Sequence, residues 1–126
     1  MSPKRILIID DDRIHLATTQ ELLEEEGYDV ITHLSGFGAT ERVLVTRPDL
    51  VLLDVNMPAL SGEALLPILR NRDSIKATPV VLHSSNDESA LRAAATRLGA
   101  AGYVCKGDVT GLRRTVARLS GGPSTP

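Results

Sequence analysis

Four short apolar runs in this sequence each end at side chains that could carry chemistry. These side chains are Asp10 and Asp11, Asp54, Ser84 and Lys106. Short apolar runs that alternate with helical stretches are typical of parallel strands. Because binding sites in open α/β sheets lie at the carboxyl ends of the strands, we expect these side chains to meet in one crevice. Three carboxylates, one ammonium and one hydroxyl are costly to gather unless a cation and a ligand join them.

The elements that must position these side chains follow one another in strict alternation. Strands are predicted over residues 4–9, 29–32, 50–53, 79–83 and 102–105. Helices are predicted over residues 13–26, 37–46, 63–70, 88–98 and 110–119, with a turn over residues 60–62. Pro67 is expected either in the first turn of its helix or at a kink. Five β–α pairs in this order predict an α/β fold with a doubly wound parallel sheet.

Length and composition are those of one ordinary domain. The 126 residues suffice for one sizeable core, and we expect a domain over residues 1–120 followed by a flexible tail or linker over residues 121–126. A net charge of −2 argues against disorder and against nucleic-acid binding driven by charge. The sequence holds no run near the roughly 20 apolar residues of a membrane span, no secretory signal, and one cysteine, Cys105. These features predict a cytoplasmic location.

Four motifs, taken together and in order, resemble those of the receiver domain of two-component response regulators over about residues 4–119. The motifs are Ile-Ile-Asp-Asp-Asp, Leu-Asp-Val-Asn-Met-Pro followed by Gly62, Pro-Val-Val-Leu-His-Ser, and Gly-Tyr-Val-Cys-Lys. The resemblance implies a flavodoxin-like fold, with a five-stranded parallel sheet in the order 2-1-3-4-5. It also implies phosphoryl transfer to Asp54.

A carboxylate such as Asp54 is a competent nucleophile toward phosphorus, and a divalent cation offsets the repulsion between the two anions. Mg²⁺ (or Mn²⁺) prefers oxygen ligands. We expect Asp11 and Asp54 to bind it directly and Asp10 to act through water. The resemblance implies that the backbone carbonyl of Asn56 is a further ligand. The alternative for Asp10 and Asp11 is capping of the first helix, a role that we assign to Asp12.

Three further residues have a functional and an ordinary interpretation. Lys106 is expected to pair with Asp54 and then with the phosphoryl group, and the alternative is a surface lysine. Ser84 is expected to donate its hydroxyl to the phosphoryl group, and the alternative is a turn residue. The resemblance implies that Tyr103 switches between outward and inward rotamers, but an ordinary half-buried strand aromatic fits equally well.

Several residues depart from the family pattern or need a separate interpretation. Gly107 stands where a proline usually follows the lysine, which predicts a trans Lys106–Gly107 peptide and a more flexible loop. His83, where an aliphatic residue is usual, is expected to pack inside a strand, whereas His15 and His33 are expected at the surface. Asn56 and Asn86 flank the position of the hydrolytic water that the resemblance implies, and amides have no general-base power.

These features favour a phosphorylation-activated signalling switch. We expect a histidine kinase or phosphotransfer protein as phosphodonor, a downstream protein or a missing output domain as target, and no contact of this segment with nucleic acid or membrane. Such a domain catalyses its own phosphorylation and dephosphorylation and is not a turnover enzyme. One alternative is an interaction module that works without phosphorylation. Another, a Mg²⁺-dependent phosphatase, is disfavoured because Asn56 stands where a second aspartate is needed.

Overall fold

Every predicted strand and helix is present, in the predicted order, in the computed structural model, which describes residues 3–57 and 61–123. The strands are β1 (Arg5–Ile9), β2 (Asp29–His33), β3 (Leu50–Leu53), β4 (Val80–Ser84) and β5 (Gly102–Cys105). The helices are α1 (Arg13–Glu25), α2 (Ala39–Thr46), α3 (Gly62–Arg70), α4 (Glu88–Leu98) and α5 (Val109–Ser120). The sheet order is β2-β1-β3-β4-β5 with all neighbours parallel, which confirms the flavodoxin-like doubly wound fold.

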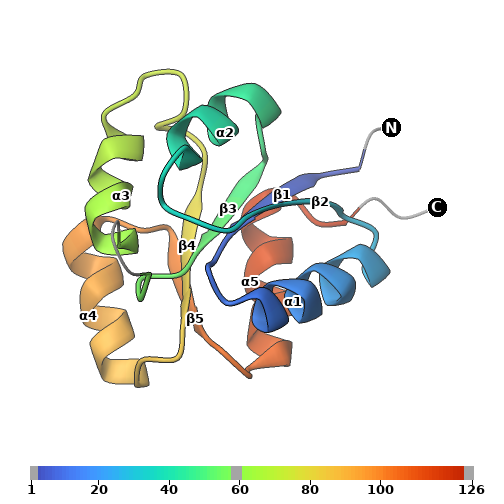
Figure 1. Cartoon of the computed structure of the whole chain (residues 1–126). Coiled ribbons are helices and arrows are strands. Elements are labelled where there is room, and N and C mark those ends of the chain that lie inside the picture. The colour runs from blue at the N-terminus through green and yellow to red at the C-terminus, as the bar shows by residue number, and fades with distance from the viewer. Residues whose placement is uncertain (1–2, 58–60, 124–126) are drawn as a thin grey trace.

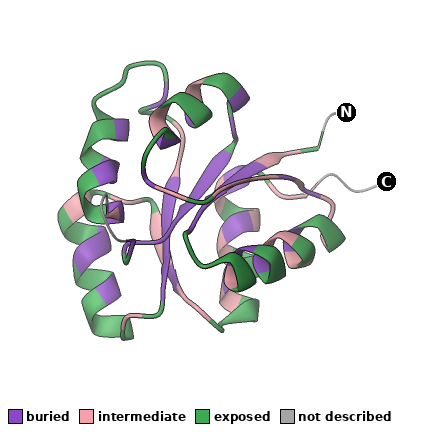
Figure 2. Ribbon diagram, in the orientation of Figure 1, coloured by how far each residue is buried: buried purple, intermediate pink, exposed green. Residues whose placement is uncertain are grey.

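Helices cover both faces of the sheet, with α1 and α5 on one face and α2, α3 and α4 on the other (Figure 1). Strands β3 and β4 are therefore buried throughout, as parallel strands between two helical layers must be (Figure 2). Side chains alternate between the two cores: Leu7 and Ile9 pack toward α2, α3 and α4, whereas Ile6 and Ile8 pack toward α1 and α5. In the part of the chain that is described, no helix has the length and apolar character needed to cross a membrane.

Side-chain caps fix where four of the five loops after strands turn into helices. Asp12 accepts hydrogen bonds from the amides of Ile14 and His15, as predicted for a capping aspartate. The remaining side-chain caps are Ser61 on α3, Asp87 on α4 and Asp108 on α5. These four loops leave the carboxyl ends of β1, β3, β4 and β5, so the caps also fix the edge of the sheet where the polar side chains were expected.

The observed boundaries differ from the predicted ones by at most two residues. The largest difference is at α2, which begins at Ala39 rather than at residue 37 because Gly38 precedes it in a left-handed conformation without a side-chain cap. Pro67 lies beyond the first turn of α3, and the helix continues past it to Arg70. Of the predicted turn over residues 60–62, Ser61 caps α3 and Gly62 is its first residue, while residues 58–60 lie outside the described part of the chain, as do residues 124–126 of the predicted tail.

Gly62 brings the start of α3 against the end of β3. A Cβ at this position would lie 2.4 Å from the carbonyl oxygen of Asp54 and 2.8 Å from the Cα of Val55. Both neighbours are backbone atoms, so neither can rotate away. Only a residue without a side chain permits this approach, and the approach holds the backbone of Asp54 in place.

We predict that Gly62→Ala lowers the free energy of unfolding by about 1–3 kcal/mol, because the added methyl group overpacks a rigid contact. Urea unfolding measures the change. Glu63→Ala, one residue further along the same helix, is the matched control and is expected to cost less than about 1 kcal/mol because its ion pair with Arg97 is exposed. A Gly62→Ala protein as stable as the original would contradict the account of this contact.

Candidate functional site

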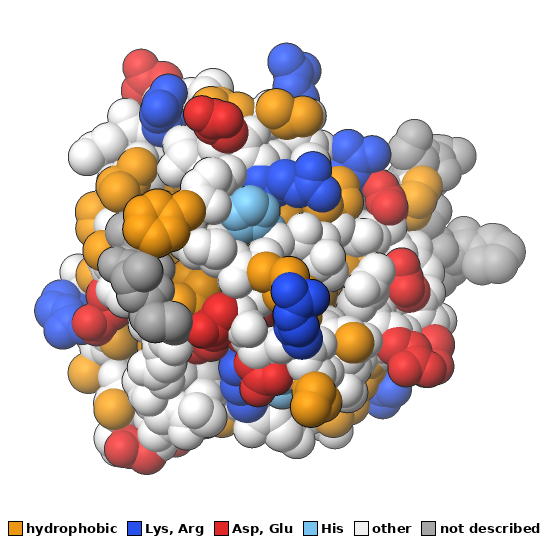
Figure 3. All heavy atoms as spheres, viewed as in Figure 1, with side chains coloured by type: hydrophobic (Ala, Val, Ile, Leu, Met, Phe, Trp, Pro, Cys, Tyr) orange, Lys and Arg blue, Asp and Glu red, His pale blue; other side chains and the backbone are white. Residues whose placement is uncertain are grey.

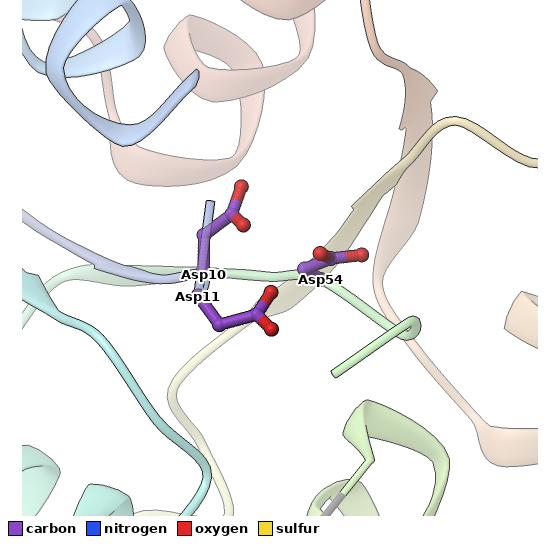
Figure 4. Close-up of side chains that lie close together, drawn as sticks. All are labelled: Asp10, Asp11 and Asp54. Carbon is purple, nitrogen blue, oxygen red and sulfur yellow. The ribbon is translucent and has the colours of Figure 1, made fainter. Parts of the chain in front are cut away.

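Three carboxylates gather at the carboxyl ends of β1 and β3 (Figure 4). Asp10, Asp11 and Asp54 each offer an oxygen, and the three oxygens lie within 4.8 Å of one another. Asp10 and Asp54 are only 2% and 4% exposed, whereas Asp11 is exposed. Clustered carboxylate oxygens, with one side open to solvent, are the donor set that a hard divalent cation prefers. The cluster could therefore hold a metal ion.

The ammonium group of Lys106 lies between the two buried carboxylates. Its Nζ is 3.0 Å from Oδ2 of Asp10 and 3.4 Å from Oδ2 of Asp54. The predicted pairing with Asp54 is thus present, but the shorter contact is to Asp10. Nothing in the sequence distinguishes the two carboxylates, because Lys106 follows β5 and reaches both across the sheet edge.

Burial and these charges shift the pKa values of the three groups in different directions. Burial opposes ionisation of Asp10, but the Asp12 amide and Lys106 outweigh it and leave the pKa of Asp10 below its ordinary value. Burial raises the pKa of Asp54, and the Asn56 amide and Lys106 offset this only in part. Burial also opposes the charge of Lys106, but the two carboxylates outweigh it and raise the pKa of Lys106. Asp54 is thus the carboxylate whose negative charge is least well compensated.

The Asn56 side chain and the Asn86 backbone nitrogen both donate to the hydroxyl of Ser84, which is fully buried. Asn56 Nδ2 donates hydrogen bonds to Ser84 Oγ at 2.8 Å and to Asn86 Oδ1 at 2.7 Å. The Asn56 amide nitrogen donates to Asp54 Oδ1 at 3.0 Å. Asn56 therefore links the carboxylate at the end of β3 to the hydroxyl at the end of β4. The sequence placed Asn56 and Asn86 near one another but contained no sign that Asn56 would bond to Ser84.

Tyr103 joins β5 to α4 through its hydroxyl group. The hydroxyl donates to Glu88 Oε1 at 2.7 Å and accepts from Arg92 Nε at 3.0 Å. Both partners are exposed side chains of α4, and the tyrosine itself is half-buried. The hydroxyl is therefore directed toward the surface of α4, and the switch role of Tyr103 stays a prediction.

Two histidines extend the site toward α1. His83 is 4% exposed, as expected for a packed strand histidine, and burial lowers its pKa to about 4. His15 and His33, both expected at the surface, are partly exposed, and His15 also has Nδ1 3.3 Å from Asp10 Oδ2, a contact that was not predicted. The imidazole rings of His15 and His83 lie 4.9 Å apart. The missed signal is that His15 is the third residue of a helix that begins directly after the aspartates, so it can turn back toward Asp10.

Gly107 follows Lys106 through a trans peptide, as predicted, since no cis bond occurs among the described residues. Its φ angle of +95° lies in the region that favours glycine. Proline, whose φ is held near −65°, could not replace it without rebuilding the loop. The departure from the family pattern therefore has a structural counterpart in the loop that carries Lys106.

Most of the predicted site residues thus lie together, and one of them, Tyr103, lies to the side. Asp10, Asp11, Asp54 and Lys106 meet at the centre, with Asn56 and Ser84 beside them, whereas Tyr103 faces α4. On the face of the molecule shown in Figure 3, acidic and basic side chains are interspersed. This face therefore lacks the single-sign basic patch that marks a nucleic-acid interface.

The sequence of this chain matches the family described as "Response regulator receiver domain" over residues 6–116. Protein PilG of Pseudomonas aeruginosa is 32% identical over 102 residues, which are 81% of this chain and 76% of PilG. The transcriptional regulatory protein PrrA of Mycobacterium leprae is 35% identical over 119 residues, which are 94% of this chain and 49% of PrrA. The chain therefore spans about three quarters of PilG and about half of PrrA.

Solved structures agree with this assignment. A putative response regulator from Chloroflexus aurantiacus has a TM-score of 0.87 at 27% identity, covering 95% of this chain and 99% of its own. The receiver domain of a signal transduction histidine kinase from Syntrophus aciditrophicus has a TM-score of 0.83 at 28% identity, covering 94% of this chain and 90% of its own. A receiver domain of a Pseudomonas aeruginosa sensor histidine kinase, with magnesium coordinated in its active-site cleft, has a TM-score of 0.85 and covers 95% of this chain and 99% of its own. Its 22% identity shows likeness of fold alone.

The low pKa of His83 predicts a specific dependence of stability on pH. Burial lowers the pKa of His83 from 6.5 to about 4 in the folded protein, so between these values the unfolded chain binds a proton that the folded chain does not. The free energy of unfolding must therefore fall as the pH falls through this window. We expect this histidine to account for a loss of about 2 kcal/mol between about pH 7.5 and about pH 5.

Urea unfolding of the original protein and of His83→Leu at both pH values isolates this contribution. The variant is expected to lose less stability on acidification by about that amount. Equal losses in the two proteins would show that His83 does not remain neutral in the folded state.

Proposed function

The chain belongs to the response regulator receiver domain family, and we propose that it is a phosphorylation-controlled switch whose phosphoacceptor is Asp54. As a member of this family it is a signalling module rather than a conventional enzyme. The observation that carries the proposal is the surroundings of Asp54: a buried carboxylate with Lys106 at 3.4 Å and with Asp10 and Asp11 close enough to share a metal ion.

Asp54 is suited to act as the nucleophile. Burial raises its pKa, which makes its carboxylate more basic than an exposed aspartate, yet the Asn56 amide and Lys106 favour the ionised form that attacks. We propose a phosphohistidine of a kinase or phosphotransfer protein as donor. An oxygen of Asp54 forms a bond to phosphorus as the nitrogen–phosphorus bond breaks, and the bonding pair leaves with the imidazole. The product is an acyl phosphate on Asp54.

The cofactor that best fits the acidic cluster is Mg²⁺, with Mn²⁺ as an alternative. The donor set consists of carboxylate oxygens, which are the ligands that small hard cations prefer. When bound, the cation neutralises charge that would otherwise repel the incoming phosphoryl group. We propose that Asp11 and Asp54 bind it directly, that Asp10 acts through water, and that the backbone carbonyl of Asn56 completes the protein ligands.

Lys106 and Ser84 are held by partners that they can exchange. Lys106 already contacts Asp54, and leaving Asp10 would free it to contact a phosphoryl oxygen. Ser84 would leave Asn56, and Asn56 would keep its second hydrogen bond to Asn86. The new contacts involve an ionised phosphoryl group and are stronger than the neutral one lost at Ser84. Phosphorylation of Asp54 thus supplies a free-energy difference that can move both residues.

The output surface that we propose includes α4 and β5. When Ser84 moves toward the phosphoryl group, Tyr103 can follow only if its hydroxyl leaves Glu88 and Arg92. A downstream protein, or an output domain elsewhere in a longer protein, then recognises the changed surface. We further propose that residues 1–120 form this receiver domain, that residues 121–126 are a tail or linker, and that the protein works in the cytoplasm without binding nucleic acid or membrane through this segment.

We predict that incubation with Mg²⁺ and acetyl phosphate adds one phosphoryl group to the protein, which intact-mass spectrometry detects. Asp54→Asn is expected to gain none, because an amide is too weak a nucleophile to displace acetate from phosphorus, and a chelator is expected to abolish the gain. An adduct of equal yield on Asp54→Asn would place the phosphoacceptor elsewhere. If the original protein gained no phosphoryl group and also failed to bind a stable phosphoryl analogue, the interaction module that needs no phosphorylation would be favoured.

We also predict that Mg²⁺ raises the free energy of unfolding, by about 1.4 kcal/mol at ten times its dissociation constant, because it binds only the folded cluster. At the same Mg²⁺ concentration, Asp11→Asn is expected to lose more than half of this gain. Asp12→Asn removes the same charge one residue away, keeps a good helix cap, and should retain the gain. Thermal unfolding with and without Mg²⁺ makes the comparison. Equal responses of the two variants would show that a general charge effect, and no specific site, is responsible.

A further inference from the structure

Two residues that depart from the family pattern, His83 and Gly107, line the same cavity. This cavity lies between α1 and α5, has a volume of about 160 Å³ and is partly open to solvent. It adjoins the acidic cluster at His15, whose Nδ1 contacts Asp10. The proposed phosphorylation does not use it.

Five polar side chains line the cavity, and four of them already have hydrogen-bond partners within the chain. The hydroxyl of Thr18 donates to the carbonyl oxygen of Ile14 at 3.0 Å. The hydroxyl of Thr19 contacts His15 Nδ1 at 3.5 Å. Asp108 accepts from the amide of Gly111 at 2.9 Å as the cap of α5. These groups do not need a ligand.

His83 is the exception. The residue is 4% exposed, and its imidazole makes no side-chain hydrogen bond to another residue in the described part of the chain. Among the described residues, the fully enclosed side-chain polar atom that lacks a partner is the Tyr28 hydroxyl, so the ring nitrogens of His83 have access to the cavity that the ring lines. Because burial lowers the pKa of His83 to about 4, the ring is neutral at pH 7 and offers one donor and one acceptor. The ring can therefore form a hydrogen bond with one polar group of a ligand in the cavity, and such a bond adds a modest net free energy of binding.

Gly107 helps to keep the cavity open. No atom beyond its two chain neighbours lies within 4 Å of the point where its Cβ would stand, and its positive φ angle excludes the proline that is usual in the family. The remaining walls are apolar side chains of α1 and α5. With no uncommitted charged group facing the space, a charged ligand would lose its hydration without compensation.

We propose that this cavity binds a small uncharged organic molecule, about the size of one aromatic ring, whose single hydrogen-bonding group pairs with His83. The volume supports this size, because an apolar cavity of about 150 Å³ engineered in another protein binds benzene. It is too small for most of a larger ligand, since typical drug-sized pockets begin at about 300 Å³. The proposal is independent of phosphorylation at Asp54.

The test is a titration of the ¹⁵N-labelled protein with phenol, followed by amide chemical shifts, with toluene as a probe of similar size that lacks the hydroxyl. Phenol is expected to cause saturable shifts in α1 and in the loop between β5 and α5. His83→Leu is expected to weaken phenol binding about three- to tenfold, the value of one hydrogen bond, while toluene still binds.

Two valine-to-tryptophan variants provide the matched control. Val109 lines the cavity, so Val109→Trp is expected to fill it and to abolish binding of both probes. Val45 is 78% exposed on α2, on the other face of the sheet, and Val45→Trp is expected to bind like the original protein. The proposal is overturned if phenol causes no saturable shifts, if Val109→Trp retains them, or if His83→Leu binds phenol as tightly as the original protein does.

Discussion

One ammonium group, that of Lys106, is shared by the two buried carboxylates Asp10 and Asp54, and the rest of the site depends on this interaction. Two carboxylates this close would otherwise repel one another in an environment that screens charge poorly. The fold brings together both the carboxylates that repel one another and the ammonium group that compensates their charge. Neighbouring strands β1 and β3 deliver the aspartates, and β5 delivers the lysine to the same edge of the sheet. The caps on the following helices and the close contact at Gly62 then hold these strand ends still.

The contacts that hold the site together can also be exchanged for other contacts. Ser84 is bonded to Asn56, Lys106 to Asp10, and Tyr103 to Glu88 and Arg92, and each contact can be exchanged for another. None of these contacts is covalent. A new doubly charged group on Asp54 would compete for the first two directly and would bias the third through β4 and β5. Our account of the switch is therefore a shift between two sets of modest contacts, and needs no large movement of the core.

The sequence predicted most of the fold and the centre of the site because both depend on local patterns. Apolar runs identify the strands, and parallel topology brings their polar ends together whatever the details of packing. Contacts that depend on tertiary geometry could not be predicted. Three contacts are of this kind: Lys106 with Asp10, Asn56 with Ser84, and His15 with Asp10. Each joins two elements whose relative placement only the structure supplies. The start of α2 was misplaced for a local reason, since Gly38 offers no side chain to cap the helix.

Beryllofluoride, which mimics a phosphoryl group on an aspartate, tests the central claim most directly. We would record the ¹⁹F NMR spectrum of the protein with beryllofluoride and Mg²⁺, and repeat it with Asp54→Asn and with a chelator. Our account predicts a resonance from bound fluoride in the original protein that is absent from both controls. If the original protein with Mg²⁺ shows only free beryllofluoride, Asp54 does not form the phosphoryl site, and the switch mechanism is wrong.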